Sequence, residues 1–202
     1  PKPICNFKCS YCYADYFGDI NIHEDNRKKG EFDKRVEFAH EMERRGIIHP
    51  SFTTLHFSDG EICVDPKRDG LYELADEYNN SWIYSNASIF SEEIADLMKK
   101  KKASIHVAID SGTPETFKVI KGVDAYKKVC DNLKKYAAVD SKRIVMKYIY
   151  LPGKNSEKKD IDGFVELCNE LNPQSCFVDV DAVLPKTDLP DNDLKQITYM
   201  IV

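Results

Sequence analysis

The sequence predicts an α/β fold in which parallel strands form an open partial barrel. Short apolar stretches, rich in Val, Ile, Tyr and Phe, alternate with longer stretches whose apolar residues recur at helical spacing. Ser, Thr, Pro and Gly residues that start helices or form turns stand between these stretches. Alternation of this kind is typical of a parallel sheet covered by helices.

The expected strands are short, as buried parallel strands usually are. The fifth differs from the others because Asp179 and Asp181 interleave with its apolar residues. His56 and His106 fall within strands, where either side chain could face the barrel interior but packing in the core is the expectation. The predicted strands are residues 52–57, 82–85, 103–109, 143–150 and 176–183.

The expected helices are marked by apolar spacing and by start signals. Ser91 precedes two glutamates, and Thr113 precedes Pro114, which are both typical of a helix N-terminus. The run Lys99 to Lys102 is interpreted as a helix end, because lysines are favoured there. The predicted helices are residues 31–45, 71–78, 92–101, 113 onward, 123–138, 156–171 and 192–200.

Chain length limits how much of a barrel can form. A complete eight-unit barrel usually needs about 250 residues, whereas this chain has 202. The strand that should lead into the first cysteine is reduced to Pro1–Ile4, and the last helix stops at Val202. We therefore expect an open partial (β/α)6-type TIM barrel, truncated at both ends, in one domain over residues 1–202 that is compatible with a fragment of a longer protein.

Composition excludes several function classes. The net charge is −5 and the basic residues are spread among acids, so no nucleic-acid partner is expected. No apolar stretch reaches membrane-spanning length and no signal peptide is visible, so no membrane partner is expected either. The odd number of cysteines suits a reducing cytoplasm. Four scattered cysteines are expected to be buried small residues: Cys63, Cys130, Cys168 and Cys176.

The other three cysteines form a C-x3-C-x2-C motif at Cys5, Cys9 and Cys12. Three thiols are one short of a closed site, because structural zinc and iron–sulfur sites normally use four protein ligands. Half of a zinc site is one alternative, with His23 as the nearest further ligand, but His23 has no second partner at finger-like spacing. Three buried small residues are the other alternative, which the polar residues between the cysteines argue against.

Polar residues follow the predicted strands, at the sheet edge where α/β proteins place their chemistry. The first strand is followed by Ser58-Asp59-Gly60-Glu61, the second by Ser85-Asn86, and the third by Asp110. Ordinary turn formation and helix capping are the alternative interpretations of these residues.

The cysteine spacing, with aromatic Tyr11 before the third cysteine, resembles the cluster loop of the radical S-adenosylmethionine (radical SAM) enzymes. The strand-end motifs also occur in the order found in that family, through about Leu184. The resemblance implies a radical SAM core domain. It implies that Cys5, Cys9 and Cys12 hold a 4Fe-4S cluster, through which they serve catalysis, and that the fourth iron binds the amino and carboxylate groups of S-adenosylmethionine.

The resemblance further implies residues that contact S-adenosylmethionine. They are Tyr11 beside the adenine; Ser58, Asp59, Gly60 and Glu61 near the ammonium; Ser85, Asn86 and Asp110 near the ribose; Lys121 at the methionine carboxylate; Lys147 in the barrel interior; and Leu184 at the adenine edge. Ile62 replaces a proline of the family pattern and Ala87 replaces a glycine, and three further positions depart from it. Asp59 replaces a glycine, Ala108 replaces a serine, and Lys121 replaces an arginine, which keeps the charge but loses bidentate geometry.

The activity that the resemblance implies is radical chemistry. A flavodoxin- or ferredoxin-like donor reduces the cluster, S-adenosylmethionine is cleaved to methionine and a 5′-deoxyadenosyl radical, and the radical abstracts hydrogen from an unidentified substrate, a peptide or a small molecule. The first alternative is a non-catalytic iron–sulfur, SAM-binding or interaction module, which Asp59 and Ala108 favour. The second, a small electron-transfer protein, would use four cysteines and a smaller fold.

Overall fold

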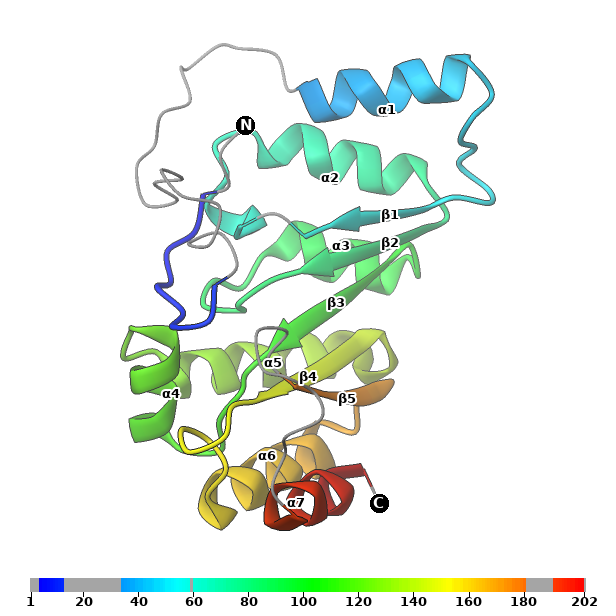
Figure 1. The fold of residues 1–202 in the computed structure, drawn as a ribbon. Helices are drawn as coiled ribbons and strands as arrows, with labels where there is room; N and C mark the ends of the chain where they lie inside the picture. Colours follow the sequence, from blue (N-terminus) through cyan, green and yellow to red (C-terminus); the bar gives the residue numbers. More distant parts are fainter. Residues whose placement is uncertain (1–3, 13–33, 59, 181–190, 202) are drawn as a thin grey trace.

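The structure, a computed structural model, describes residues 4–12, 34–58, 60–180 and 191–201. Five parallel strands form one open sheet in the order β1-β2-β3-β4-β5 (Figure 1). This confirms the predicted α/β class, and each predicted strand is present with small shifts at its ends. The strands are β1 (Thr54–Phe57), β2 (Asn80–Tyr84), β3 (Ala103–Ala108), β4 (Ile144–Tyr150) and β5 (Ser175–Val180).

The helices follow the predicted order and connect the strands. Ser91 accepts a hydrogen bond from the Ile94 N–H, and Thr113 accepts one from the Thr116 N–H, so both predicted N-caps are confirmed. The helices are α1 (Lys34–Arg44), α2 (Arg68–Glu77), α3 (Glu92–Lys99), α4 (Pro114–Lys121), α5 (Tyr126–Asp140), α6 (Lys158–Leu171) and α7 (Asp191–Ile201), with short 3-10 turns η2 (Ile62–Val64) and η3 (Ser141–Arg143).

One face of the sheet carries the main core. Alternate strand residues such as Ile83, Ile105 and Met146 are fully buried and pack in one cluster with apolar residues of the helices. Because side chains alternate along a strand, the residues between them point to the opposite face, which we call the inner face. None of the described helices has the length and apolar character needed to cross a membrane.

The inner face corrects one prediction. His56 and His106 were expected to pack in the core, but both lie on the inner face. Their strand neighbours, Leu55 for His56 and Ile105 for His106, pack on the helix side, and the two-residue period therefore turns the histidines the other way.

A second correction concerns the scattered cysteines. Cys63 is buried as predicted, but Cys130 and Cys168 are only partly buried and Cys176 is exposed. Cys176 belongs to β5, which lies at the edge of the sheet within the described residues. An edge strand has a neighbouring strand on one side only, so a small apolar side chain there is more exposed to solvent.

Candidate functional site

The three cysteines lie on a loop, residues 4–12, that runs past the carboxyl ends of the first strands (Figure 1). We call it the cysteine loop. Its start is bonded to the turn after β1, where the Glu61 N–H donates to the Ile4 carbonyl at 2.7 Å. Its middle is bonded to the end of α4, where the N–H groups of Lys8 and Ser10 donate to backbone carbonyls at 3.0 and 2.8 Å. Elements far apart in the sequence therefore hold the loop.

Two glycines permit this close approach. Gly60 has φ +70°, and a Cβ placed there would lie 2.2 Å from the Ile4 carbonyl oxygen. Gly122 has φ +68° and caps α4, and a Cβ there would lie 2.7 Å from the carbonyl oxygen of Lys8. Only glycine suits both the left-handed backbone and the missing space.

The turn after β2 contacts the start of the cysteine loop. Asn86 donates through Nδ2 to Asn6 Oδ1 at 2.7 Å, and the same nitrogen lies 3.9 Å from Cys5 Sγ. Asn6 in turn donates to Ser88 Oγ at 2.8 Å. The structure thus brings Asn86 beside a cysteine. Asn6 and Ser88 were missed from sequence, where polar turn residues carry little signal.

Glu61 is almost fully buried, and its carboxylate organises this edge. It accepts hydrogen bonds from the Asn86 N–H at 2.5 Å, from Ser85 Oγ at 3.0 Å and from the Cys63 N–H at 3.1 Å. Burial raises the pKa of Glu61, and these donors oppose that rise. The carboxylate joins the β1 and β2 turns, while its contact with a ligand ammonium stays a prediction.

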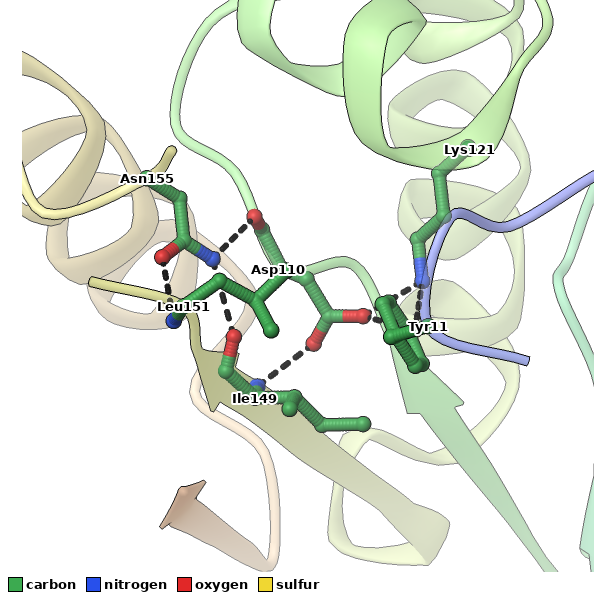
Figure 2. A network of polar contacts seen from close by, with 6 residues as sticks. All are labelled: Tyr11, Asp110, Lys121, Ile149, Leu151 and Asn155. Carbon is green, nitrogen blue, oxygen red and sulfur yellow. Dashed lines mark hydrogen bonds and ion pairs between the residues drawn. The ribbon is translucent and has the colours of Figure 1, made fainter. Parts of the chain in front are cut away.

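A buried charged network pins the other end of the loop (Figure 2). Asp110 is fully buried, and its carboxylate pairs with Lys121 Nζ at 2.5 Å. The Tyr11 hydroxyl donates to the same carboxylate and accepts from Lys121 Nζ at 2.6 Å. The second carboxylate oxygen of Asp110 accepts from the Ile149 N–H at 2.6 Å. One carboxylate therefore joins the cysteine loop, α4 and β4.

Asn155 completes the network from the loop after β4 (Figure 2). Its Nδ2 donates to the carbonyls of Asp110 at 2.9 Å and Ile149 at 2.8 Å, and its Oδ1 accepts from the Leu151 N–H at 2.7 Å. A single buried amide thus ties the ends of β3 and β4 together.

The network rules out the helix-capping alternative for Asp110 and shows that Lys121 is buried. Asp110 does not cap α4, because Thr113 does, and Asp110 instead adopts φ +55° at the strand end. Lys121 is 3% exposed, so it is not a solvated surface lysine. Burial, followed by the negative charge of Asp110, raises the pKa of Tyr11 well above its usual value.

The remaining predicted site residues lie apart from this network. Lys147 is on the inner face and pairs with Asp179 at 3.2 Å. Ser58 is exposed at the end of β1. Asp59 and Leu184 lie outside the described residues, as does His23.

The three thiols are partly buried and free of disulfides. Burial raises the pKa of Cys9 to about 11, the nearby ammonium of Lys121 opposes that rise, and Cys5 and Cys12 add to it. The three cysteines are therefore close enough to interact electrostatically. Among the described residues, however, no three ligating side chains converge on a single metal ion. The buried ammonium of Lys121 lies near Cys9, where a positive charge favours a thiolate.

The open parallel sheet is a partial barrel, and the cysteine loop at its carboxyl edge is a candidate cofactor site. The family model described as the Radical SAM superfamily matches residues 1–167. The chain therefore belongs to the radical SAM superfamily.

Individual relatives are distant. An uncharacterised protein of Archaeoglobus fulgidus is 26% identical over 147 residues, which are 72% of this chain and 33% of that protein. Among solved structures, SuiB of Streptococcus suis bound to S-adenosylmethionine matches with a TM-score of 0.72 at 14% identity, over 98% of this chain and 44% of SuiB. A radical SAM methyltransferase from Sphaerobacter thermophilus matches with a TM-score of 0.65 at 13% identity, over 98% of this chain and 60% of that enzyme. The chain thus spans about a third of the archaeal protein and less than half of SuiB.

Proposed function

We propose that this chain is a catalytic radical SAM core that holds a 4Fe-4S cluster through Cys5, Cys9 and Cys12 and cleaves S-adenosylmethionine at the carboxyl edge of the sheet. The observation that carries the proposal is the cysteine loop itself. It is bonded to the β1 turn and the end of α4, and its Tyr11 is pinned by Asp110. Such anchoring holds the backbone that carries the three cysteines in place before any cofactor binds, which favours a preorganised ligand set.

When bound, the cluster supplies the electron that cleaves S-adenosylmethionine into methionine and a 5′-deoxyadenosyl radical. The residues of the chain position and shield the site. Lys121 places a buried positive charge near Cys9, which stabilises thiolate ligands. Phe7, which is 3% exposed and packs edge-to-face on Phe117 at 5.9 Å, fills the space beneath the loop and excludes water there.

The substrate, the electron donor and the compartment belong to the proposal as well. SuiB of S. suis is known bound to the precursor peptide SuiA, and the structurally similar anSMEcpe is known bound to S-adenosylmethionine and a peptide. A peptide or a small molecule is therefore proposed as the substrate class. A flavodoxin- or ferredoxin-like electron donor and a cytoplasmic location complete the proposal, since both suit an oxygen-sensitive cluster.

Anaerobic reconstitution tests the proposal. The protein is supplied with iron and sulfide, then reduced with S-adenosylmethionine present, and 5′-deoxyadenosine is measured. We expect a cluster of about four irons per chain and formation of 5′-deoxyadenosine. Cys9→Ala should lose the full cluster, whereas Cys130→Ala, a partly buried thiol on α5, should keep it. If Cys9→Ala retains a full cluster, the ligand assignment is wrong.

The same experiment distinguishes the proposed enzyme from the non-catalytic alternative. Ala108, at the end of β3, has no hydroxyl, and the resemblance described above implies a serine at this position. A cluster that forms without production of 5′-deoxyadenosine would indicate a binding module instead of an enzyme.

A further inference from the structure

Two cysteines outside the cysteine loop lie side by side between α6 and β5. Cys168 is in the last turn of α6, and Cys176 is near the start of β5. All five strands run parallel, so the start of β5 is at the amino edge of the sheet, whereas the cysteine loop lies at the carboxyl edge. The pair is therefore separate from the candidate cofactor site.

The strand register turns Cys176 toward α6. Cys176 is in register with Met146 of β4, which is fully buried on the helix side of the sheet. Residues in register on neighbouring strands point to the same face. Cys168 packs from α6 against the apolar cluster that contains Met146. The two thiols therefore come together, and the Cys168 S–H donates a hydrogen bond to Cys176 Sγ.

The backbone between the two cysteines is fixed by hydrogen bonds. The Asn172 N–H donates to the Cys168 carbonyl at 2.9 Å, and the Gln174 N–H donates to the Ile144 carbonyl of β4 at 2.8 Å. Lys142 Nζ donates to the Asn172 carbonyl at 3.0 Å. These bonds hold the last turn of α6 against the start of β5, so the two thiols stay neighbours.

The two thiols differ in charge state and in access to solvent. The hydrogen bond from Cys168 lowers the pKa of Cys176, and the same bond, followed by burial, raises the pKa of Cys168. Cys176 is exposed and Cys168 is partly buried. The thiolate is the reactive form of cysteine, and redox-active cysteines are accessible thiolates beside a second thiol. Cys176 is therefore the attacking group and Cys168 the second thiol.

We propose that Cys168 and Cys176 form a redox-active dithiol, which a low-molecular-weight disulfide such as oxidised glutathione converts to an intramolecular disulfide. The Cys176 thiolate attacks one sulfur of oxidised glutathione and forms a mixed disulfide, and one glutathione thiolate leaves. Cys168 then gives up its proton and attacks the Cys176 sulfur, and the second glutathione leaves. The protein loses two electrons and two protons in total, and one oxidised glutathione becomes two reduced ones.

The disulfide would join α6 to β5 at the edge of the sheet that is remote from the cysteine loop. Its formation therefore does not depend on the cluster or on S-adenosylmethionine. The proposal adds a second, separate cysteine site to the one described above.

Peptide mapping tests the proposal. The full chain is incubated anaerobically with millimolar oxidised glutathione, free thiols are blocked with N-ethylmaleimide, and the protein is digested with trypsin. Residues 160–186 form one tryptic peptide, in which Cys168 and Cys176 are the only cysteines, so its products are read separately from those of the cysteine loop. We expect this peptide to lose two hydrogen atoms and to carry neither N-ethylmaleimide nor glutathione. Dithiothreitol should restore both thiols.

A pair of variants tests the role of each thiol. Cys168→Ala removes the second thiol, so glutathione should stay attached to Cys176. It also removes the hydrogen-bond donor, so Cys176 should react with iodoacetamide at neutral pH at least about threefold more slowly. Cys130→Ala, which removes a partly buried thiol on α5, should change neither the disulfide nor that rate.

Three results would overturn the proposal. The first is a 160–186 peptide from the parent protein that keeps both thiols. The second is a parent protein in which glutathione stays on Cys176 as it does in Cys168→Ala. The third is a Cys176 thiol that reacts equally fast with and without Cys168. Because the parent protein alone decides the first two results, the test does not depend on how well the variants fold. Because the readout is a peptide mass, a failure of cluster binding leaves it unaffected.

Discussion

Asp110→Asn should destabilise the protein strongly while changing its shape very little. Asparagine has nearly the size of aspartate and tolerates the left-handed backbone at φ +55°. The change removes the charge and replaces one acceptor oxygen by an NH2 donor, and it leaves the ammonium of Lys121 buried at 3% exposure without its counter-ion. Breaking a buried ion pair in this way costs about 3–5 kcal/mol, against a total stability of about 5–15 kcal/mol for a typical domain.

The measurement is urea and thermal unfolding of the cluster-free protein, followed by circular dichroism. The expected loss corresponds to a fall in Tm of roughly 6–20 °C for a chain of this length. The double variant Asp110→Asn with Lys121→Met removes both charges and should recover at least about 2 kcal/mol of the loss. The control is Glu170→Gln, which breaks the exposed pair with Lys134 and should leave the free energy of unfolding nearly unchanged.

Two results would refute this reasoning. One is an Asp110→Asn variant within about 1 kcal/mol of the parent protein, which would mean that the charges are not buried as a pair. The other is a double variant that is no more stable than Asp110→Asn alone, because an unpaired Lys121 would then not be the source of the loss.

Three further predictions concern the loop and the inner face. Gly60→Ala should reduce iron uptake on reconstitution because its Cβ would meet the Ile4 carbonyl oxygen at 2.2 Å; Gly153→Ala has the same positive φ but nothing within 4 Å, and it should load iron normally. His106→Gln should reduce the loss of stability at acid pH. Because the pKa of His106 is lowered to about 4, its contribution to the free energy of unfolding is full above pH ~6.5 and falls by about 1–2 kcal/mol, after allowance for solvent screening, as the pH drops toward ~4. Urea unfolding at several pH values measures this dependence, and a variant with the same pH dependence as the parent protein would contradict the prediction. Tyr11→Phe removes one hydroxyl that both donates and accepts, so it should cost about 1–2 kcal/mol in the same unfolding assay, and a neutral result would show that the hydroxyl does not hold the loop.

Much of the fold could be predicted because its signals are local. Apolar periodicity located the five strands and the helices, and the caps at Ser91 and Thr113 follow from a side chain and an N–H three residues apart. Helix starts without such a cap were less certain: Ser156 was expected to begin α6, whereas the helix begins at Lys158. The sequence around a strand also does not show whether that strand lies at the edge of the sheet. The prediction that Cys176 is buried was therefore wrong, because β5 is an edge strand within the described residues.

The candidate site was only partly predictable. The cysteine motif, Asn86 and Asp110 could be named because each directly follows a strand or forms a compact pattern. Their partners could not be assigned, since the Tyr11 hydroxyl meets Asp110 across 99 positions of the chain. Nothing in the local sequence distinguishes a lysine that pairs inside the protein, as Lys121 does, from one that reaches solvent or a ligand.

The sequence by itself determined the order of the elements, the three-cysteine motif and the strand ends at which polar residues gather. These depend on periodicity and short spacing, which act between residues close in the chain. Only the tertiary structure decided that Asp110, Lys121 and Tyr11 form one buried network, and that His56, Trp82 and His106 meet on the inner face. Those outcomes depend on which strands become neighbours and in which register, and the packing of the whole sheet sets both.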